Sequence, residues 1–315
     1  PGAVRRFLTR VEPRAAIILE TEIWPNLYRQ CHDAGVPLLI ANARISDRSF
    51  DRYRRLFRLT SGALACVDRI AAQSERDADR LRAIGAPSER VVTTGNVKFD
   101  IELPAGIEEA GRAIRSDWGD HRPVLVAGST HPDEEDVVLE AFKTVIGAFP
   151  EALLVLVPRH PERFDSAVRA AADAGLRTSR LSETPACPGE SQCYVIDAMG
   201  VLLNYYAAAD VAFVGGSLVT VGGHNVLEPA AIGRPVITGP HTFNFQDITE
   251  KLIEGGGAVR VQDAPALADE TRRLFSDKAA RREMGRRGRE LVGEGQGAVD
   301  RTLALIDNLL SEEAG

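Results

Sequence analysis

The stretch VAFVGGSLVTVGGHNVLEP, residues 211–229, joins an apolar run to two glycine pairs and a polar cluster. Val211–Val214 is apolar at every position, which is typical of a strand buried on both faces of a parallel sheet. Gly215 and Gly216 follow, and glycines let a loop turn sharply and bring a ligand close to the backbone. A helix is expected to begin near Asn225. The stretch therefore predicts one strand–loop–helix unit of an open α/β fold.

The same unit recurs along the chain. Short apolar runs alternate with helical patterns, and the further runs are Ala15–Leu19, Val36–Ala41, Arg69–Ala72, Arg90–Thr94, Val124–Ala127, Ala152–Val157, Cys193–Ile196 and Pro235–Thr238. Repeated βα units predict parallel sheets with right-handed crossovers. Ligands of open α/β sheets bind beyond the carboxyl ends of the strands, so the residues that follow these runs are the candidate site residues.

The length of 315 residues suits two domains better than one. A composition break rich in glycine and acidic residues lies at 100–120 and marks the boundary. We expect a Rossmann-like domain at 1–110 and a second at 111–296, two doubly wound domains that face each other across a cleft. Residues 297–315 include an amphipathic helix that is expected to cross back onto the first domain.

Composition excludes several classes of protein. A net charge of -7 and only 6% aromatic residues argue against nucleic-acid binding. The four cysteines form no CxxC pair and no zinc-ligand spacing, which is typical of free thiols in a reducing compartment. There is no signal peptide and no apolar run of about 18 residues. The chain begins at Pro1 rather than Met, so we expect the first domain to be truncated, and a membrane anchor to lie in the missing part if there is one.

Familiar catalytic motifs are missing from the sequence. It contains no G-x-G-x-x-G, Walker A, G-x-S-x-G or H-E-x-x-H string, which disfavours a nicotinamide enzyme, a P-loop NTPase, a serine hydrolase and a zinc protease. No metal ligands and no cofactor are predicted.

Two strand ends in the second half carry candidate anion ligands. Gly128-Ser129-Thr130 follows one strand and precedes a helix, where amides and hydroxyls suit a phosphate. The alternative is an ordinary helix N-cap with a proline near the first helical position. Arg159 follows the next buried strand, and its guanidinium can hold a phosphate or carboxylate bidentately. A solvated or acid-paired arginine is the alternative there.

The glycine-rich loop is the most informative segment. The helix start near Asn225 would offer amides to a phosphate, and Glu228 on its first turn could accept from ribose hydroxyls. A capping box of Asn225 and Glu228 would explain these two residues as well. It would leave the four nearby glycines and His224 unexplained.

The first half carries carboxylates and arginines. Glu20 and Glu22 follow a strand, where they could orient a substrate hydroxyl or act as a base. The alternative is a helix start whose acids favour the helix dipole. Arg44 and Arg48 open a dense set of arginines that extends to Arg58, which indicates an anionic partner such as a sugar phosphate or an acidic lipid. An ordinary solvated basic helix face is the alternative.

Strings spread over nearly the whole chain resemble strings that occur in the same order in bacterial Kdo (3-deoxy-D-manno-octulosonic acid) transferases. They are ETEIWPN (20–26), NARISDR (42–48), TGNVKFD (94–100), GSTH (128–131), PRHPER (158–163), the glycine-rich loop from GGS to EP (215–229) and GPHTFNF (239–245). Several of them are long and unusual, so the resemblance is specific.

The resemblance implies a GT-B glycosyltransferase that moves Kdo from CMP-Kdo to a lipid A precursor in lipopolysaccharide core synthesis. It implies inversion at the anomeric carbon without a metal, at the cytoplasmic face of the inner membrane, with the protein peripheral or anchored through an N-terminal segment. The donor site implied is Gly128, Ser129, Thr130, Arg159, His160, Met199, Gly216, Ser217, His224, Asn225 and Glu228. The acceptor is expected near Glu22, Arg44 and Arg48. Arg159 and Glu22 are the candidate catalytic residues.

Two departures from the family pattern stand out. The family's proposed base is a glutamate in a Gly-Glu loop near the native N-terminus, and no such segment precedes Glu20 here. Val201 follows Gly200 where the family often has glutamate. The rival hypotheses are another GT-B enzyme with a UDP-sugar, either a transferase or a 2-epimerase, and a non-catalytic donor-binding fragment.

Overall fold

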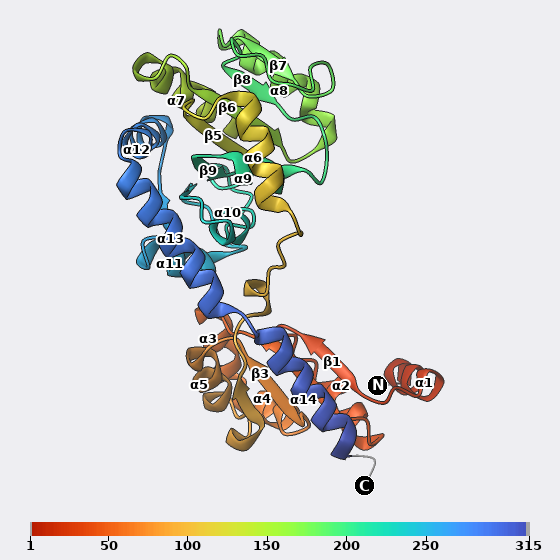
Figure 1. The fold of residues 1–315 in the computed structure, drawn as a ribbon. Coiled ribbons are helices and arrows are strands. Elements are labelled where there is room, and N and C mark those ends of the chain that lie inside the picture. Colours follow the sequence, from red (N-terminus) through yellow and green to blue (C-terminus); the bar gives the residue numbers. More distant parts are fainter. Residues whose placement is uncertain (1, 313–315) are drawn as a thin grey trace. The chain divides into compact units, whose positions relative to one another are not determined.

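The computed structural model describes residues 2–312 and divides into two compact α/β units (Figure 1). The first unit comprises the described residues up to Asp100 together with those from Gly295 onward. The second unit is the continuous segment Ile101–Glu294. No helix in the described part of the chain is long and apolar enough to cross a membrane.

The first unit holds a four-stranded parallel sheet in the order β1-β2-β3-β4. Its strands are β1 (Ala16–Leu19), β2 (Leu38–Ala43), β3 (Arg69–Ala72) and β4 (Val91–Thr93), and its helices are α1 (Gly2–Val11), α2 (Pro25–Asp33), α3 (Asp47–Arg55), α4 (Phe57–Leu64), α5 (Glu75–Ala83) and α14 (Ala298–Glu312). All six positions of β2 are buried, as its continuous apolar run predicts.

The two faces of β2 pack against different helices. Ile40 belongs to a cluster with Tyr28 of α2, Leu64 of α4 and Leu81 of α5. Leu39 and Ala41, which alternate with Ile40 and point to the other face, pack against Leu309 of α14. The last helix of the chain therefore completes the core of the first unit.

The second unit holds a seven-stranded parallel sheet in the order β11-β10-β9-β5-β6-β8-β7. Its strands are β5 (Val124–Thr130), β6 (Leu153–Pro158), β7 (Thr178–Arg180), β8 (Cys193–Val195), β9 (Val211–Val214), β10 (Val236–Thr238) and β11 (Ala258–Arg260), and its helices are α6 (Ile107–Trp118), α7 (Glu134–Ala148), α8 (Phe164–Asp173), α9 (Leu202–Ala208), α10 (Leu227–Ala231), α11 (Gln246–Glu254), α12 (Ala264–Ser276) and α13 (Lys278–Gly295). From β5 the chain first adds β6, β7 and β8 on one side of that strand. It then adds β9, β10 and β11 on the other side. The switch point of this doubly wound sheet lies between β5 and β9.

Helices cover both faces of this sheet. One face packs on α7, α8 and α12, through side chains such as Phe142, Ala171 and Leu267. On the other face Tyr206 of α9 lies against Gly128, where an added Cβ would meet the tyrosine hydroxyl at 2.2 Å. All strands predicted from the sequence are present. The short strands β7 and β11 were missed, because neither contains an apolar run of the expected length.

The units divide after Asp100, whereas the composition predicted a boundary between residues 110 and 111. The residues from Ile107 to Trp118 form α6, which packs on α9 of the second unit. Gly111, which signalled a linker in the sequence, is a close-contact position: a Cβ there would lie 2.6 Å from the Cβ of Ala207. Its glycine serves helix packing rather than flexibility.

Candidate functional site

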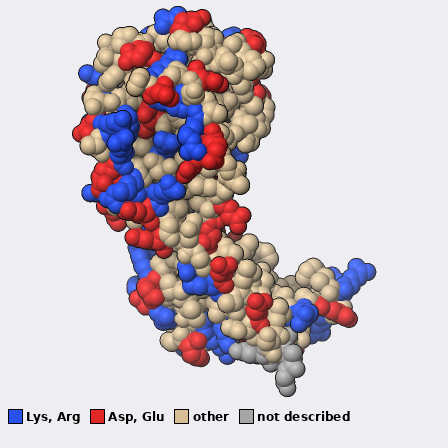
Figure 2. All heavy atoms as spheres, viewed as in Figure 1, with Lys and Arg blue, Asp and Glu red and all other residues tan. Residues whose placement is uncertain are grey.

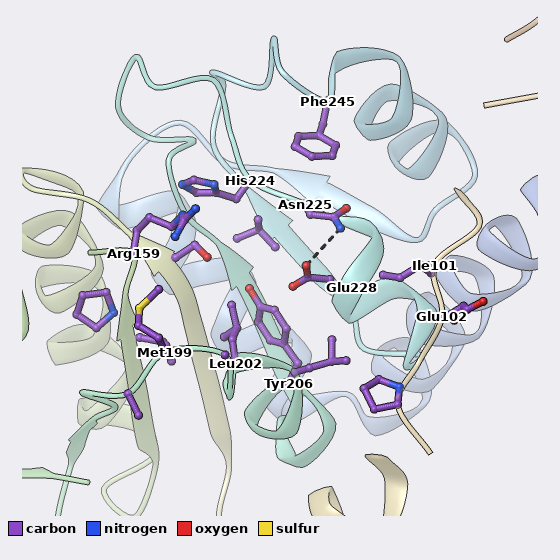
Figure 3. Close-up of a pocket in the computed structure, with 18 residues that line it drawn as sticks. Ile101, Glu102, Arg159, Met199, Leu202, Tyr206, His224, Asn225, Glu228 and Phe245 are labelled. Atoms are coloured by element: carbon purple, nitrogen blue, oxygen red, sulfur yellow. Dashed lines mark hydrogen bonds between the residues drawn. The ribbon is translucent and has the colours of Figure 1, made fainter. Parts of the chain in front are cut away.

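A pocket of about 510 Å³ opens at the carboxyl ends of β5, β6 and β9 (Figure 3). It lies at the switch point of the sheet, where open α/β folds bind their ligands. Of the candidate donor-site residues, Ser129, Arg159, Met199, His224, Asn225 and Glu228 line this pocket. Gly128, Thr130, His160, Gly216 and Ser217 lie outside its lining.

The end of β5 separates two neighbouring hydroxyls. The register between β5 and β6 shifts between Gly128 and Thr130, and Ser129 has a left-handed φ of 57°. This irregularity turns Ser129 toward the pocket. Thr130 is fully buried and its hydroxyl donates to Glu135 at 3.3 Å. Only the serine of the predicted pair is therefore available to a ligand in the pocket.

Arg159 supplies the positive charge of the pocket. Its backbone amide donates to Thr130 at 3.0 Å at the end of β6, which fixes where the side chain leaves the sheet. In Figure 3 the guanidinium reaches toward His224. Within residues 2–312 the group makes no hydrogen bond or ion pair, so it is free to bind an anion.

Three histidines cluster beside Arg159. The Nε2 atoms of His131 and His224 lie 2.7 Å apart, and the two rings are nearly parallel, with an interplanar angle of 7°. His160 meets His131 edge-on, with ring centroids 5.4 Å apart. Burial, His131 and the positive charge of Arg159 lower the pKa of His224 to about 4, and burial also lowers the pKa of His131. The hydrogen-bonded pair is therefore neutral near pH 7, with one ring donating and the other accepting.

A carboxylate stands opposite Arg159. Glu228 lies on the first turn of α10, and its Oε1 accepts from Nδ2 of Asn225 at 3.3 Å (Figure 3). Burial raises the pKa of Glu228. Oδ1 of Asn225 accepts from the amide of Leu227 at 3.1 Å, so Asn225 contacts both the first residue of the helix and Glu228. The helix begins at Leu227, two residues after Asn225, and has 5 residues. The anion site expected at its start stays a prediction.

Three consecutive amides of the glycine-rich loop are already occupied. Those of Gly216, Ser217 and Leu218 all donate to the buried carboxylate of Glu134. The Ser217 hydroxyl donates to Val214 at 2.6 Å and accepts from the amide of Gly239 at 2.8 Å. Gly216 and Ser217 therefore hold the loop together instead of facing the pocket.

Sequence reasoning missed Glu134 and Tyr206. Glu134 follows the strand-end Gly-Ser-Thr-His string, where nothing in the local sequence indicates its distant backbone partners. Tyr206 is 1% exposed, and in Figure 3 its hydroxyl points into the pocket on the side of Glu228. A tyrosine within the apolar helix α9 is a usable signal, because a buried phenol requires a polar partner.

The candidate acceptor residues belong to the first unit. Glu22 is exposed and accepts from the indole of Trp24 at 2.8 Å. Arg44 follows β2 and is half-buried, and Arg48 is exposed on α3. Their roles stay predictions.

The surface of α3 and α4 is both basic and apolar. Its exposed arginines are Arg48, Arg52, Arg54, Arg55 and Arg58, and Leu56, Phe57 and Leu59 beside them are 51%, 47% and 56% exposed. Figure 2 shows basic and acidic side chains interspersed on the face that it draws. On α13 of the second unit Arg286 pairs with Glu283 and Glu290, and α3 itself carries the exposed acids Asp47 and Asp51. Residues 2–312 contain no group of three or more His, Cys, Asp or Glu side chains that could hold a metal ion.

Comparison with known proteins relates the chain to one family. A family model described as 3-deoxy-D-manno-octulosonic-acid transferase (kdotransferase) matches residues 1–101. A protein of Haemophilus influenzae named 3-deoxy-D-manno-octulosonic acid transferase is 38% identical over 97% of this chain and 72% of its own length. One of the same name from Bordetella pertussis is 39% identical over 98% of this chain and 72% of its own length.

Solved structures show the same architecture. The C-terminal CMP-Kdo binding domain of WaaA from Acinetobacter baumannii is 31% identical, with a TM-score of 0.57, over 60% of this chain and 99% of that domain. The UDP-GlcNAc 2-epimerase of Neisseria meningitidis, bound to UDP-GlcNAc, is 13% identical, with a TM-score of 0.61, over 97% of this chain and 79% of its own. At that identity the epimerase shows the fold alone. The predicted GT-B class of two Rossmann-like units is confirmed.

Proposed function

This chain belongs to the 3-deoxy-D-manno-octulosonic acid (Kdo) transferase family, and from that premise we propose that it transfers Kdo from CMP-Kdo to a lipid A precursor. It is a glycosyltransferase of lipopolysaccharide synthesis. The observation that carries the donor half of the proposal is the pocket at the switch point of the second unit, in which an unpaired guanidinium faces a carboxylate.

The second unit is the proposed donor domain. The Acinetobacter domain, whose title names CMP-Kdo as its ligand, covers 60% of this chain, and the second unit is the larger of the two. Both Arg159 and Glu228 line the pocket, and we propose that Arg159 binds the phosphate of the donor and that Glu228 accepts from hydroxyls of the ribose or the sugar. Ser129 adds a hydroxyl at the same strand ends.

The proposed mechanism follows from where charge develops. The bond between the anomeric carbon of Kdo and the phosphate oxygen of CMP breaks, so the carbon gains positive charge and the phosphate gains negative charge. Arg159 stabilises the departing phosphate electrostatically, which is the role that a metal ion has in other transferases. The acceptor hydroxyl attacks the face opposite to CMP, and the configuration at the anomeric carbon inverts.

The acceptor is proposed to meet the first unit. Glu22, Arg44 and Arg48 are proposed to orient it, and no residue of this chain is assigned to the deprotonation of its hydroxyl. The arginines and exposed apolar side chains of α3 and α4 suit an anionic lipid surface, because the former attract headgroups and the latter enter the interface. We place the protein at the cytoplasmic face of the inner membrane on this basis.

Calorimetric titration with CMP and with UDP tests the donor site. The parent protein should bind CMP in preference to UDP, and Arg159→Ala should weaken CMP binding by about 10–100-fold, the range of a lost charged hydrogen bond. Arg169→Ala is the matched control, since Arg169 is exposed on α8 and does not line the pocket. Preference for UDP would refute the CMP-Kdo donor and support a UDP-sugar enzyme.

A further inference from the structure

Glu134 is a fully buried acid whose carboxylate is surrounded by backbone amides. It is the first residue of α7 and is 0% exposed. Its oxygens accept from the amides of Gly216, Ser217 and Leu218 at 2.7, 2.9 and 2.8 Å. The amide of His131 donates to it as well, at 3.3 Å.

Consecutive amides that turn toward one point form a nest, a backbone arrangement that binds anions such as phosphate. Here the nest at the end of β9 holds a side chain of the same chain. Burial raises the pKa of Glu134, whereas the four amide donors oppose that effect. The donors leave no acceptor for a carboxyl proton, so the hydrogen-bond geometry favours the ionised form. A phosphate cannot enter this nest without displacing the carboxylate.

Hydrogen bonds connect the nest to the pocket. The carbonyl of Gly216 accepts from the amides of Gly222 and Gly223 at 3.1 and 2.8 Å, and the amide of His224 donates to Gly215 at 3.1 Å. His224 then meets the ring of His131, whose own amide is held by the same oxygen of Glu134 that binds Gly216. The two loops that carry His131 and His224 are thus fixed by one carboxylate.

We propose that Glu134 is a positioning residue of the donor site: its carboxylate fills the nest as a resident anion and fixes the loop from Gly215 to His224 in the arrangement that binds the donor. The proposal rests on the donor site proposed above. The amides of Gly216, Ser217 and Leu218 are then not available to the donor phosphate, which is consistent with Arg159 as its proposed ligand.

The proposal is tested by removing the carboxylate of Glu134 and then supplying a free carboxylate in solution. Glu134→Ala deletes the CH₂–COO⁻ end of the side chain, and acetate replaces those atoms. We expect Glu134→Ala to weaken CMP binding at least tenfold, acetate to restore most of the loss, and neutral acetamide to restore none. Amide hydrogen exchange at residues 216–218 and 222–224 should accelerate in the variant and slow again with acetate.

Glu135→Ala is the matched control. Glu135 is the next residue, is 1% exposed, and bonds to Arg163 and Thr130 outside the pocket. Acetate should change neither CMP binding nor exchange of the 216–224 amides in this variant. A merely structural loss at Glu134 would resemble Glu135→Ala and would not respond to acetate.

Each outcome tests either the positioning role of Glu134 or the donor site itself. Unchanged exchange at 216–218 in Glu134→Ala, or a loss of CMP binding that acetate does not restore, overturns the positioning role. Failure of the parent protein to bind CMP refutes the donor site, while the exchange measurement still tests the nest. If Glu134→Ala does not fold, Glu134→Gln replaces one acceptor oxygen by an NH₂ group; faster exchange at 216–218 supports the proposal, and parental exchange overturns it.

Discussion

Acid should destabilise the protein through His224, and replacement of this histidine should remove part of that effect. Burial, His131 and Arg159 lower the pKa of His224 from 6.5 to about 4. In the unfolded chain the imidazole regains its ordinary pKa of about 6.5. Between these values the unfolded state binds a proton that the folded state does not, so the free energy of unfolding falls as the pH drops from about 6.5 to about 4.

The size of the effect follows from the two pKa values. A difference of about 2.5 in pKa corresponds to about 3 kcal/mol of unfolding free energy. His224 shares its ring hydrogen bond with His131, whose pKa is also lowered, so the two rings titrate as a pair. The loss that depends on His224 alone is therefore expected to be smaller than this value.

Urea denaturation between pH values of about 4 and about 8 measures this effect. The free energy of unfolding of His224→Gln should depend less steeply on pH than that of the parent. His121→Gln is the control, because His121 is exposed and outside the pocket, and it should keep the parental dependence. A parental pH dependence in His224→Gln would refute the assignment of a neutral, buried imidazole to this position.

Three further substitutions and one control substitution test other parts of the structure. Tyr206→Phe should weaken CMP binding about 3–10-fold in calorimetry, because it removes a hydroxyl that faces the pocket. The melting temperature should change little. Unchanged CMP binding would show that the phenol does not contact the ligand. Gly111→Ala should cost about 1–3 kcal/mol in urea denaturation, since its Cβ would lie 2.6 Å from that of Ala207. Gly147→Ala, with open space at its Cβ, should be neutral or stabilising, and equal effects of the two alanines would contradict the packing of α6 on α9. Asp100→Ala removes the carboxylate that accepts from amides at the start of α14. The free energy of unfolding should fall by ~1 kcal/mol, and proteolysis of the C-terminal helix should be faster. Proteolysis at the parental rate would count against a capping role of Asp100.

The apolar runs predicted the strands because both faces of these parallel sheets are buried. β6 and β9, for example, are buried at every position, so their sequences carry the signal directly. Thr178–Arg180 pairs at the edge of the sheet through its backbone and is only half-buried, so the run that identifies a central strand is absent from it.

The site was only partly predictable. Arg159 and Glu228 could be found because each directly follows a strand or a glycine-rich turn, where side chains face a ligand. Ser217 and Thr130 occur in the same kind of segment, yet their hydroxyls bond inside the protein. Sequence spacing identifies the loops at the strand ends. Which of their side chains face the pocket depends on the left-handed φ of Ser129 and on the position of the distant Glu134 carboxylate. Glu134, which lies 82 residues from Gly216, shows how far apart such partners can be.

The chain passes from the first unit to the second and back, so the second unit is inserted within the first. Leu309 lies under Leu39 and Ala41, which were synthesised about 270 residues earlier. During translation the second unit can fold as soon as its continuous segment leaves the ribosome, while the sheet of the first unit keeps one apolar face uncovered. The first domain to emerge is therefore the last to be completed, and an expression fragment that ends at residue 100 would lack the helix that closes its core.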